Sequence, residues 1–206
     1  MHTTVATPDG PFTIIVDAQH VLASGWTEDH ASLRALIHPQ LRNQAEYDAT
    51  RLSQPQTGGP LAPGARSASS ESVQATSGTY SGPAEESERS DALINRAVQA
   101  VQAYYSGKHG AVAEIPVRQR SGPYRERAWE VLRQVKPGQP VSYAEYARRT
   151  GSPAAIRAAA GACAQNAAAL FVPCHRVIRT DGSLGGFRYG LEIKTSLLNR
   201  ERQPKT

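Results

Sequence analysis

The sequence predicts an α/β protein, with a small antiparallel sheet near the N-terminus and a mostly helical C-terminal part. Residues 12–17 are rich in β-branched side chains, and a turn separates them from a second run over 21–26, a pattern typical of a β-hairpin. From residue 91 onward, apolar residues recur at helical spacing between segments rich in turn residues. Strands followed by helices indicate a sheet domain joined to a helical one.

Further elements follow from local patterns. Apolar residues at helical spacing predict a helix within residues 30–48, which Pro39 interrupts. Asp91 is placed to cap a second helix. Residues 113–117 predict a short strand that closes the front sheet, and residues 124–135 predict another helix.

Two short helices are expected next, in close succession. Ser142 is a favourable N-cap for a helix that runs to about residue 150, where Gly151 takes the C-terminal cap position. Ser152 and Pro153 restart a helix at once, as its cap and first residue. Two short helices around one tight turn predict a helix-turn-helix.

The second of these helices has few large side chains. Residues 158–162 are all alanine or glycine. Such a face allows close approach to another surface, which is either a DNA groove or the neighbouring helix.

Composition also predicts the domain organisation. Residues 53–90 contain nine serines, five glycines and four prolines, and they lack the apolar residues needed to offset ordering entropy. We therefore expect a flexible linker or insertion there. The N-terminal α/β domain begins with residues 1–52 and is completed or joined by 91–117, and residues 118–206 form the C-terminal domain.

Charge and cysteine content restrict the class of protein. Residues 1–96 hold 6 Lys/Arg and 11 Asp/Glu, whereas residues 97–206 hold 17 and 7. The basic C-terminal half indicates either a polyanionic partner or a solvated basic surface. The two cysteines exclude a disulfide scaffold and a zinc site built mainly from thiolates. With no apolar run long enough for a membrane span and no signal peptide, the expected location is the reducing cytoplasm.

Cys174 is the residue best suited to covalent chemistry. Sulfur reacts as thiolate, and His175 and Arg176 follow the cysteine directly. Neighbours on an extended strand point to opposite faces, so a bridging water or a turn would have to connect Cys174 to His175. A Cys-His pair by itself is more typical of a buried structural cysteine, and the surrounding motifs decide between the two interpretations.

The chain around Cys174 resembles the signature of the O6-alkylguanine-DNA alkyltransferases, also called methylated-DNA–protein-cysteine methyltransferases. The resemblance covers residues 91–202 and, more loosely, residues 10–28. Its motifs are Trp129-Glu130-Val131-Leu132, Val141-Ser142-Tyr143-Ala144-Glu145, Arg157, Asn166, Pro173-Cys174-His175-Arg176-Val177, Gly185-Gly186-Phe187-Arg188-Tyr189-Gly190, Lys194, Leu197-Leu198 and Glu201.

The resemblance implies a ribonuclease H-like N-terminal domain and a winged helix-turn-helix in the C-terminal domain. It also implies that the protein flips O6-alkylguanine, and O4-alkylthymine, out of duplex DNA and transfers the alkyl group irreversibly to one cysteine. The transfer needs no metal or other cofactor, and each molecule reacts once. The implied partner is double-stranded DNA, bound in the minor groove by a monomer that can cluster on DNA.

The resemblance further implies a role for each matching residue. Cys174 would accept the alkyl group, His175 would deprotonate the thiol through a water, and Glu201 would orient the histidine. Asn166 would organise the turn before the cysteine, and Tyr143 would donate a hydrogen bond to the flipped base. The remaining implied base contacts are Val177, Phe187, Arg188 and Lys194. The implied DNA contacts are Arg157, which fills the gap left by the base, and Ala158, Gly161, Ala162 and Thr180.

Several milder interpretations stay open. Tyr143 alone would fit a helix surface, Arg157 a phosphate contact and Lys194 a surface position. Cys163 fits either a packing residue or a second thiol. Ala167 stands where the family often has proline, which predicts a less rigid turn before Cys174.

Three other function classes compete with alkyl transfer. A non-catalytic binder of alkylated DNA would lack the acceptor cysteine, and a helix-turn-helix regulator would need base-reading polar side chains where residues 158–162 offer none. A Cys-His hydrolase would not need the DNA-binding elements.

Overall fold

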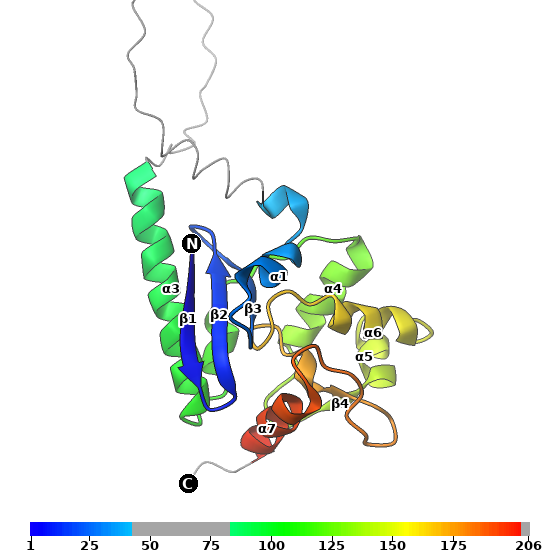
Figure 1. The fold of residues 1–206 in the computed structure, drawn as a ribbon. Coiled ribbons are helices and arrows are strands. Elements are labelled where there is room, and N and C mark those ends of the chain that lie inside the picture. The colour runs from blue at the N-terminus through cyan, green and yellow to red at the C-terminus, as the bar shows by residue number, and fades with distance from the viewer. Residues whose placement is uncertain (43–82, 203–206) are drawn as a thin grey trace, which may run out of the picture.

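The computed structural model describes residues 1–42 and 83–202, and it contains a three-stranded antiparallel sheet at the N-terminus (Figure 1). The strands β1 (His2–Thr7), β2 (Gly10–Val16) and β3 (Val21–Gly25) lie in the order β1-β2-β3. The predicted hairpin is therefore confirmed as β2 and β3. Sequence patterns missed β1, because its residues alternate between exposed and half-buried and form no apolar run.

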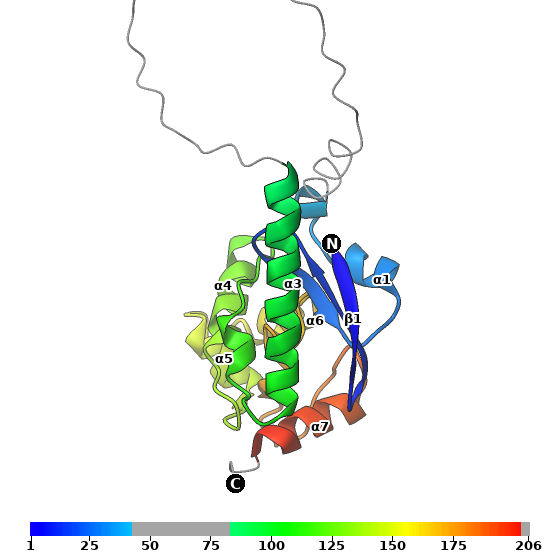
Figure 2. The ribbon, with the colours of Figure 1, turned by 90° about the vertical axis from the view of Figure 1, so that its left-hand side faces the viewer.

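Helix α3 (Pro83–Tyr105) runs along the sheet (Figure 2) and begins eight residues before the expected start at Asp91. Glu85 and Glu86 lie in its first turn, where negative charge interacts favourably with the helix dipole. The high Ser, Gly and Pro content of the flanking chain concealed this start. The expected linker over 53–90 is thus helical from Pro83, and the rest of it lies outside the described residues.

Helix α1 (His30–Ala35) is shorter than the helix expected within residues 30–48. Asp29 caps it by accepting a hydrogen bond from the Ser32 N–H at 3.0 Å. Helical backbone resumes at Pro39, as expected for a proline that cannot sit inside a helix, and residues 43–48 lie outside the described part.

The strand expected over residues 113–117 is wrong. Residues Ala111–Glu114 form a 3₁₀ turn, η1, and only Val117 pairs with the sheet, in a parallel bridge to Val21 of β3. Pro116 precedes it and has no N–H for a ladder, so the pairing cannot extend further toward the N-terminus.

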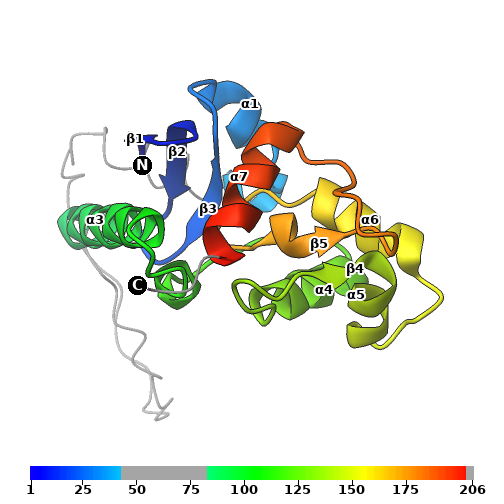
Figure 3. The same ribbon diagram turned by 90° about the horizontal axis from the view of Figure 1, so that it is seen from below.

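The C-terminal part consists of short helices around one small parallel strand pair (Figure 3). Its elements in chain order are α4 (Pro123–Arg133), β4 (Val141–Ser142), α5 (Tyr143–Arg149), α6 (Ile156–Ala164), η2 (Cys174–Arg176), β5 (Val177–Ile178) and α7 (Leu191–Arg202). Strand β4 pairs with β5. The helix expected over 124–135 is therefore confirmed as α4, within two residues at its end.

The two consecutive short helices are α5 and α6. Ser142 caps α5 as predicted, accepting from the Glu145 N–H at 3.1 Å, and Gly151 has the expected left-handed φ of 82°. The second helix starts at Ile156 and not at Pro153. The Ser152 N–H bonds to Ala147 O and closes α5, and the Ala155 N–H then bonds to Ser152 O in a separate turn, so that Ala155 is the N-cap of α6.

One buried apolar cluster joins the sheet, α3 and the C-terminal helices. Aromatic rings connect the two halves: Trp26 at the end of β3 lies 6.0 Å from Phe187 and 5.5 Å from Tyr189, between ring centroids. Tyr189 also donates to Ser24 O at 3.2 Å. Within residues 1–42 and 83–202, no helix is long and apolar enough to cross a membrane.

Gly25 lies directly against this aromatic group, because a Cβ built on it would overlap the Tyr189 ring. Gly25→Ala should lower the free energy of unfolding by about 1–3 kcal/mol through overpacking. Adding Tyr189→Ala should relieve the overlap, so the double variant should match Tyr189→Ala alone in chemical denaturation. Gly110→Ala is the control, because a Cβ there meets no atom within 4 Å. Additive costs at Gly25 and Tyr189 would contradict the contact.

Candidate active site

Cys174 lies at the start of η2, in a segment held against the front sheet. Ser24 of β3 accepts from the Ala169 N–H at 3.0 Å and donates its own N–H to Ala167 O at 2.9 Å. Its hydroxyl also donates to Ala169 O at 2.7 Å. The chain then reverses at Leu170, whose φ of 72° is unusual for a residue other than glycine.

The Cys174 side chain is 8% exposed and faces a pocket of about 430 Å³. The pocket lies between α5, α6 and the loop after β5, and it is lined by Tyr143, Ala160, Cys163, Ala164, Asn166, Ala169, Cys174, Gly186, Phe187, Arg188 and Tyr189. Its size is in the range of small-molecule sites. The sulfur of Cys174 is thus in the wall of a cavity that can admit a ligand.

Asn166 donates a hydrogen bond directly to the sulfur of Cys174. Its Nδ2 lies 3.2 Å from Cys174 Sγ and 2.8 Å from Val172 O. Its Oδ1 accepts from the Ala168 N–H at 3.2 Å and from Gln119 Nε2 at 3.0 Å. Asn166 therefore organises the turn, as expected, and also contacts the sulfur.

His175 points away from the pocket, toward a buried carboxylate. His175 Nε2 lies 2.9 Å from Glu201 Oε1, and Arg176 binds both oxygens of the same carboxylate. Tyr104 of α3 donates to Oε1 at 2.9 Å. His175 Nδ1 is buried and makes no hydrogen bond to any residue in the described part of the chain.

The environment of these groups sets their charges. Burial alone would raise the pKa of Glu201, but hydrogen bonds and charge from His175 and Arg176 outweigh it and hold that pKa below its usual range. Burial lowers the pKa of His175, against the opposing effect of Glu201. At neutral pH this arrangement favours an ionised Glu201 that accepts from a neutral His175, which leaves Nδ1 as an acceptor.

Burial raises the pKa of the Cys174 thiol, while the Asn166 hydrogen bond and the Lys194 charge lower it in part. The resting side chain is therefore a thiol, and reaction requires a base. Burial likewise raises the pKa of Tyr143 to about 12, which keeps its hydroxyl protonated and able to donate.

Tyr143, Phe187 and Arg188, three of the expected base contacts, line the pocket. The ring of Tyr143 packs against Gly185, whose φ of 67° and missing side chain permit this approach. Arg188 donates to Ala164 O at the end of α6 and joins the loop to that helix. Cys163 also lies in the pocket wall, half-buried.

Two expected base contacts lie elsewhere. Val177 is fully buried and is not part of the pocket lining. Lys194 is also buried, which rules out a surface position, and its Nζ donates to the backbone oxygens of Val177 and Leu184. Both residues hold the loop between β5 and α7 instead of facing the cavity.

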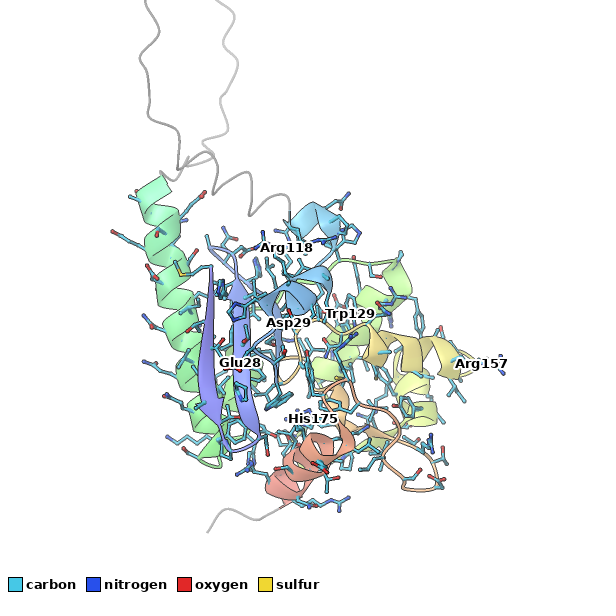
Figure 4. The ribbon with its side chains drawn as sticks, viewed as in Figure 1. Glu28, Asp29, Arg118, Trp129, Arg157 and His175 are labelled. Atoms are coloured by element: carbon cyan, nitrogen blue, oxygen red, sulfur yellow. The ribbon has the colours of Figure 1, made fainter. Side chains whose placement is uncertain are left out.

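Helix α6 presents only some of the residues proposed to contact DNA. Arg157 and Ala158 are exposed, and Figure 4 shows Arg157 projecting from the outer end of the helix. Gly161 is half-buried and Thr180 is exposed on the loop after β5. Ala162 is fully buried against α4, where its carbonyl accepts from Trp129 Nε1 at 2.8 Å. Its side chain is therefore part of the core and not of the exposed face.

Sequence patterns missed three residues of the site, which are Tyr104, Gln119 and Tyr189, and they missed the contact of Arg176 with Glu201. Arg176 and Tyr189 stand within the motifs that carry the resemblance, so their positions were visible but their contacts were not. Tyr104 and Gln119 lie far along the chain from Cys174, and no local pattern marks them. Among the described residues, no group of three or more His, Cys, Asp or Glu side chains could hold a metal ion.

Comparison with known proteins identifies a family and relatives that this chain resembles. Residues 123–203 match the family described as "6-O-methylguanine DNA methyltransferase, DNA binding domain". The bifunctional transcriptional activator/DNA repair enzyme Ada of Escherichia coli is 36% identical over 121 residues, 59% of this chain and 34% of that protein. A probable methylated-DNA–protein-cysteine methyltransferase of Acanthamoeba polyphaga mimivirus is 30% identical over 110 residues, 53% of this chain and 73% of that protein.

The fold has a solved counterpart as well. The crystal structure of Mycobacterium tuberculosis OGT in complex with DNA superposes with a TM-score of 0.62 at 23% identity, covering 98% of this chain and 92% of that one. This chain spans only 34% of the two Ada proteins it matches and 59% of a methyltransferase of Haemophilus influenzae. The matches to the family description and to the curated relatives, taken together, show that the chain belongs to the methylated-DNA–protein-cysteine methyltransferase family.

Proposed function

We propose that this protein repairs DNA directly, by transferring the alkyl group of O6-alkylguanine in duplex DNA to Cys174. The observation that carries the proposal is the position of Cys174 Sγ in a pocket wall, with a donor from Asn166 on one side and the His175–Glu201 pair behind it. The proposed nucleophile, base and orienting carboxylate have the same roles as the three groups of a hydrolytic triad. O4-alkylthymine is a further substrate in this proposal.

In the proposed reaction, the proton of the Cys174 thiol passes through a water to His175 Nδ1, and Glu201 stabilises the resulting imidazolium. The thiolate attacks the alkyl carbon, an S–C bond forms and the C–O6 bond breaks with its electron pair going to guanine. Tyr143 donates a proton to the departing base and is reprotonated from His175 through solvent. The thioether product is a poor leaving group, so each molecule reacts once and needs no cofactor.

DNA is the proposed partner, and α5 with α6 is the proposed helix-turn-helix of a winged domain that follows a ribonuclease H-like one. The exposed face of α6 carries Arg157 and Ala158 with few large side chains, which suits close approach to a minor groove. Arg157 would occupy the gap left by the flipped base. The family match over 123–203 and the DNA complex of the M. tuberculosis neighbour support this assignment. We expect a monomer that can cluster along DNA.

Two other activities give different outcomes. A non-catalytic damage binder would hold alkylated DNA without changing its own mass. A Cys-His hydrolase would turn over repeatedly and would not become labelled. The presence of Cys174, His175 and Glu201 in one arrangement favours alkyl transfer over the first.

The primary test is intact mass after incubation with a duplex that contains O6-methylguanine. We expect a gain of one methyl group per protein, which peptide mapping places on Cys174 and which Cys174→Ala abolishes. Cys163→Ala should still gain the methyl group, because Asn166 contacts the sulfur of Cys174 and His175, which is paired with Glu201, adjoins Cys174 in the chain. Tight binding of the duplex with no mass change would support the damage binder instead.

A second test addresses His175 as the proposed general base. His175→Gln should lower the rate of methyl transfer at neutral pH by about 10²- to 10⁴-fold, the usual contribution of a general base. The variant's rate should then rise about tenfold per pH unit, because hydroxide must ionise a thiol whose pKa lies above neutral. The wild-type rate should vary far less from mildly acid to mildly alkaline pH, because burial lowers the pKa of His175 and keeps it neutral. His2→Ala on β1 is the control, and parallel pH profiles for wild type and His175→Gln would exclude the role.

A third test separates the two interpretations of Arg157. If the planar guanidinium group of Arg157 takes the place of the flipped base in the DNA stack, Arg157→Ala and Arg157→Lys should both slow repair of duplex DNA. We expect a loss of about ten- to a hundredfold, since extruding a base costs a few kcal/mol. Reaction with free O6-methylguanine base should be unchanged in both. Full activity of Arg157→Lys, with the slope of log affinity against log salt reduced by about one in Arg157→Ala only, would indicate a phosphate contact.

A further inference from the structure

We propose that Gln119 is a positioning residue for the nucleophile: it sets the orientation of the Asn166 amide and thereby the hydrogen bond to Cys174 Sγ. Gln119 lies 47 residues before Asn166 in the chain, and its Nε2 donates to Asn166 Oδ1 at 3.0 Å. The inference rests on the proposed function only in taking Cys174 as the nucleophile.

The orientation of Asn166 decides what the sulfur meets. With Oδ1 toward Gln119 and the Ala168 N–H, Nδ2 faces Val172 O and Cys174 Sγ. If the amide turned by 180°, its oxygen would face the Val172 oxygen and the sulfur. An oxygen there would repel a thiolate, whereas an N–H stabilises it.

Gln119 is itself held in one orientation by a donor that cannot turn. The backbone N–H of Ala167 donates to Gln119 Oε1 at 2.8 Å, so the other end of the side chain must present Nε2 to Asn166. A proline at 167 would lack this N–H. The Ala167 N–H thus fixes the orientation of the Gln119 amide, and Gln119 in turn fixes the orientation of the Asn166 amide that donates to the sulfur.

The segment that carries Gln119 and the segment that carries Asn166 both form hydrogen bonds to strand β3, which makes the arrangement rigid. The Arg118 N–H donates to Val21 O of β3, and Ser24 of β3 exchanges backbone hydrogen bonds with Ala167 and Ala169. Val21 and Ser24 are three residues apart, or about 10 Å along a strand. Gln119 follows Arg118, which is bonded to Val21, and Asn166 precedes Ala167, which is bonded to Ser24. The Gln119 side chain therefore reaches Asn166.

The test is the pH dependence of Cys174 alkylation by iodoacetamide, measured by peptide mapping, together with the rate of methyl transfer from O6-methylguanine duplex. Gln119→Leu removes both hydrogen bonds and should raise the pH midpoint of Cys174 alkylation and slow methyl transfer about three- to tenfold, as expected for one hydrogen bond. Gln119→Glu, which cannot donate when ionised, should have the larger effect. Gln139→Glu adds the same charge on an exposed loop residue and should change neither quantity.

Combination with Asn166→Ala separates positioning from a general structural effect. If Gln119 acts through Asn166, Gln119→Leu should shift neither the midpoint nor the rate once Asn166 is alanine. An equal shift in both backgrounds, or none in the wild-type background, would overturn the proposal. The partly exposed position of Gln119 makes the variant tolerable, and thermal unfolding checks this.

Iodoacetamide needs neither DNA nor base recognition, so the two proposals can fail separately. Absence of methyl transfer in the unmodified protein, with the Gln119 effect on iodoacetamide kinetics intact, would remove the repair function and keep the positioning role.

Discussion

One buried carboxylate determines how the C-terminal part of this protein is assembled. Glu201 on α7 is ionised and nearly inaccessible, and a carboxylate can leave water only where donors and opposite charge replace the solvent. Arg176 supplies the charge, and His175, Tyr104 and the Gly138 N–H supply further hydrogen bonds. These donors come from the cysteine turn, from α3 and from the loop after α4. Satisfying the carboxylate therefore draws those segments together around the histidine that the proposed reaction needs.

The edge of β3 is the second organising element. An open strand edge exposes unpaired backbone groups, and here chain from outside the sheet covers it at two points, Val117 and Ala168. Val117 leads into α4, and Ala168 leads into Cys174. The front sheet thus sets the position of the nucleophile's own segment, although the sheet contributes no side chain to the pocket. This explains how a sheet that supplies no side chain to the pocket can still determine the geometry of the site.

The site keeps Cys174, the proposed nucleophile, protonated at rest. Burial raises the pKa of Cys174, and Lys194, the positive group that opposes this most, is itself buried and donates to backbone oxygens. A thiol in this state reacts poorly with small electrophiles in solution. In the proposed reaction, the thiolate forms when the flipped nucleobase fills the pocket, because His175 removes the proton and the hydrogen bond from Asn166 stabilises the charge. This suits a protein that can react only once.

The amino-acid sequence by itself determined the elements and residues whose signals are local. The β2–β3 hairpin, α4, the Ser142 cap and the segment around Cys174 were all visible, because periodicity, capping and motif spacing are properties of neighbouring residues. The early start of α3, the single bridge at Val117, the burial of Ala162 and Lys194, and the contacts of Tyr104 and Gln119 were not. Each of these depends on which distant segment lies alongside. Hydrogen-bond partners 47 to 97 residues apart are chosen by packing and by the need to satisfy buried polar groups, and only the tertiary structure decides them.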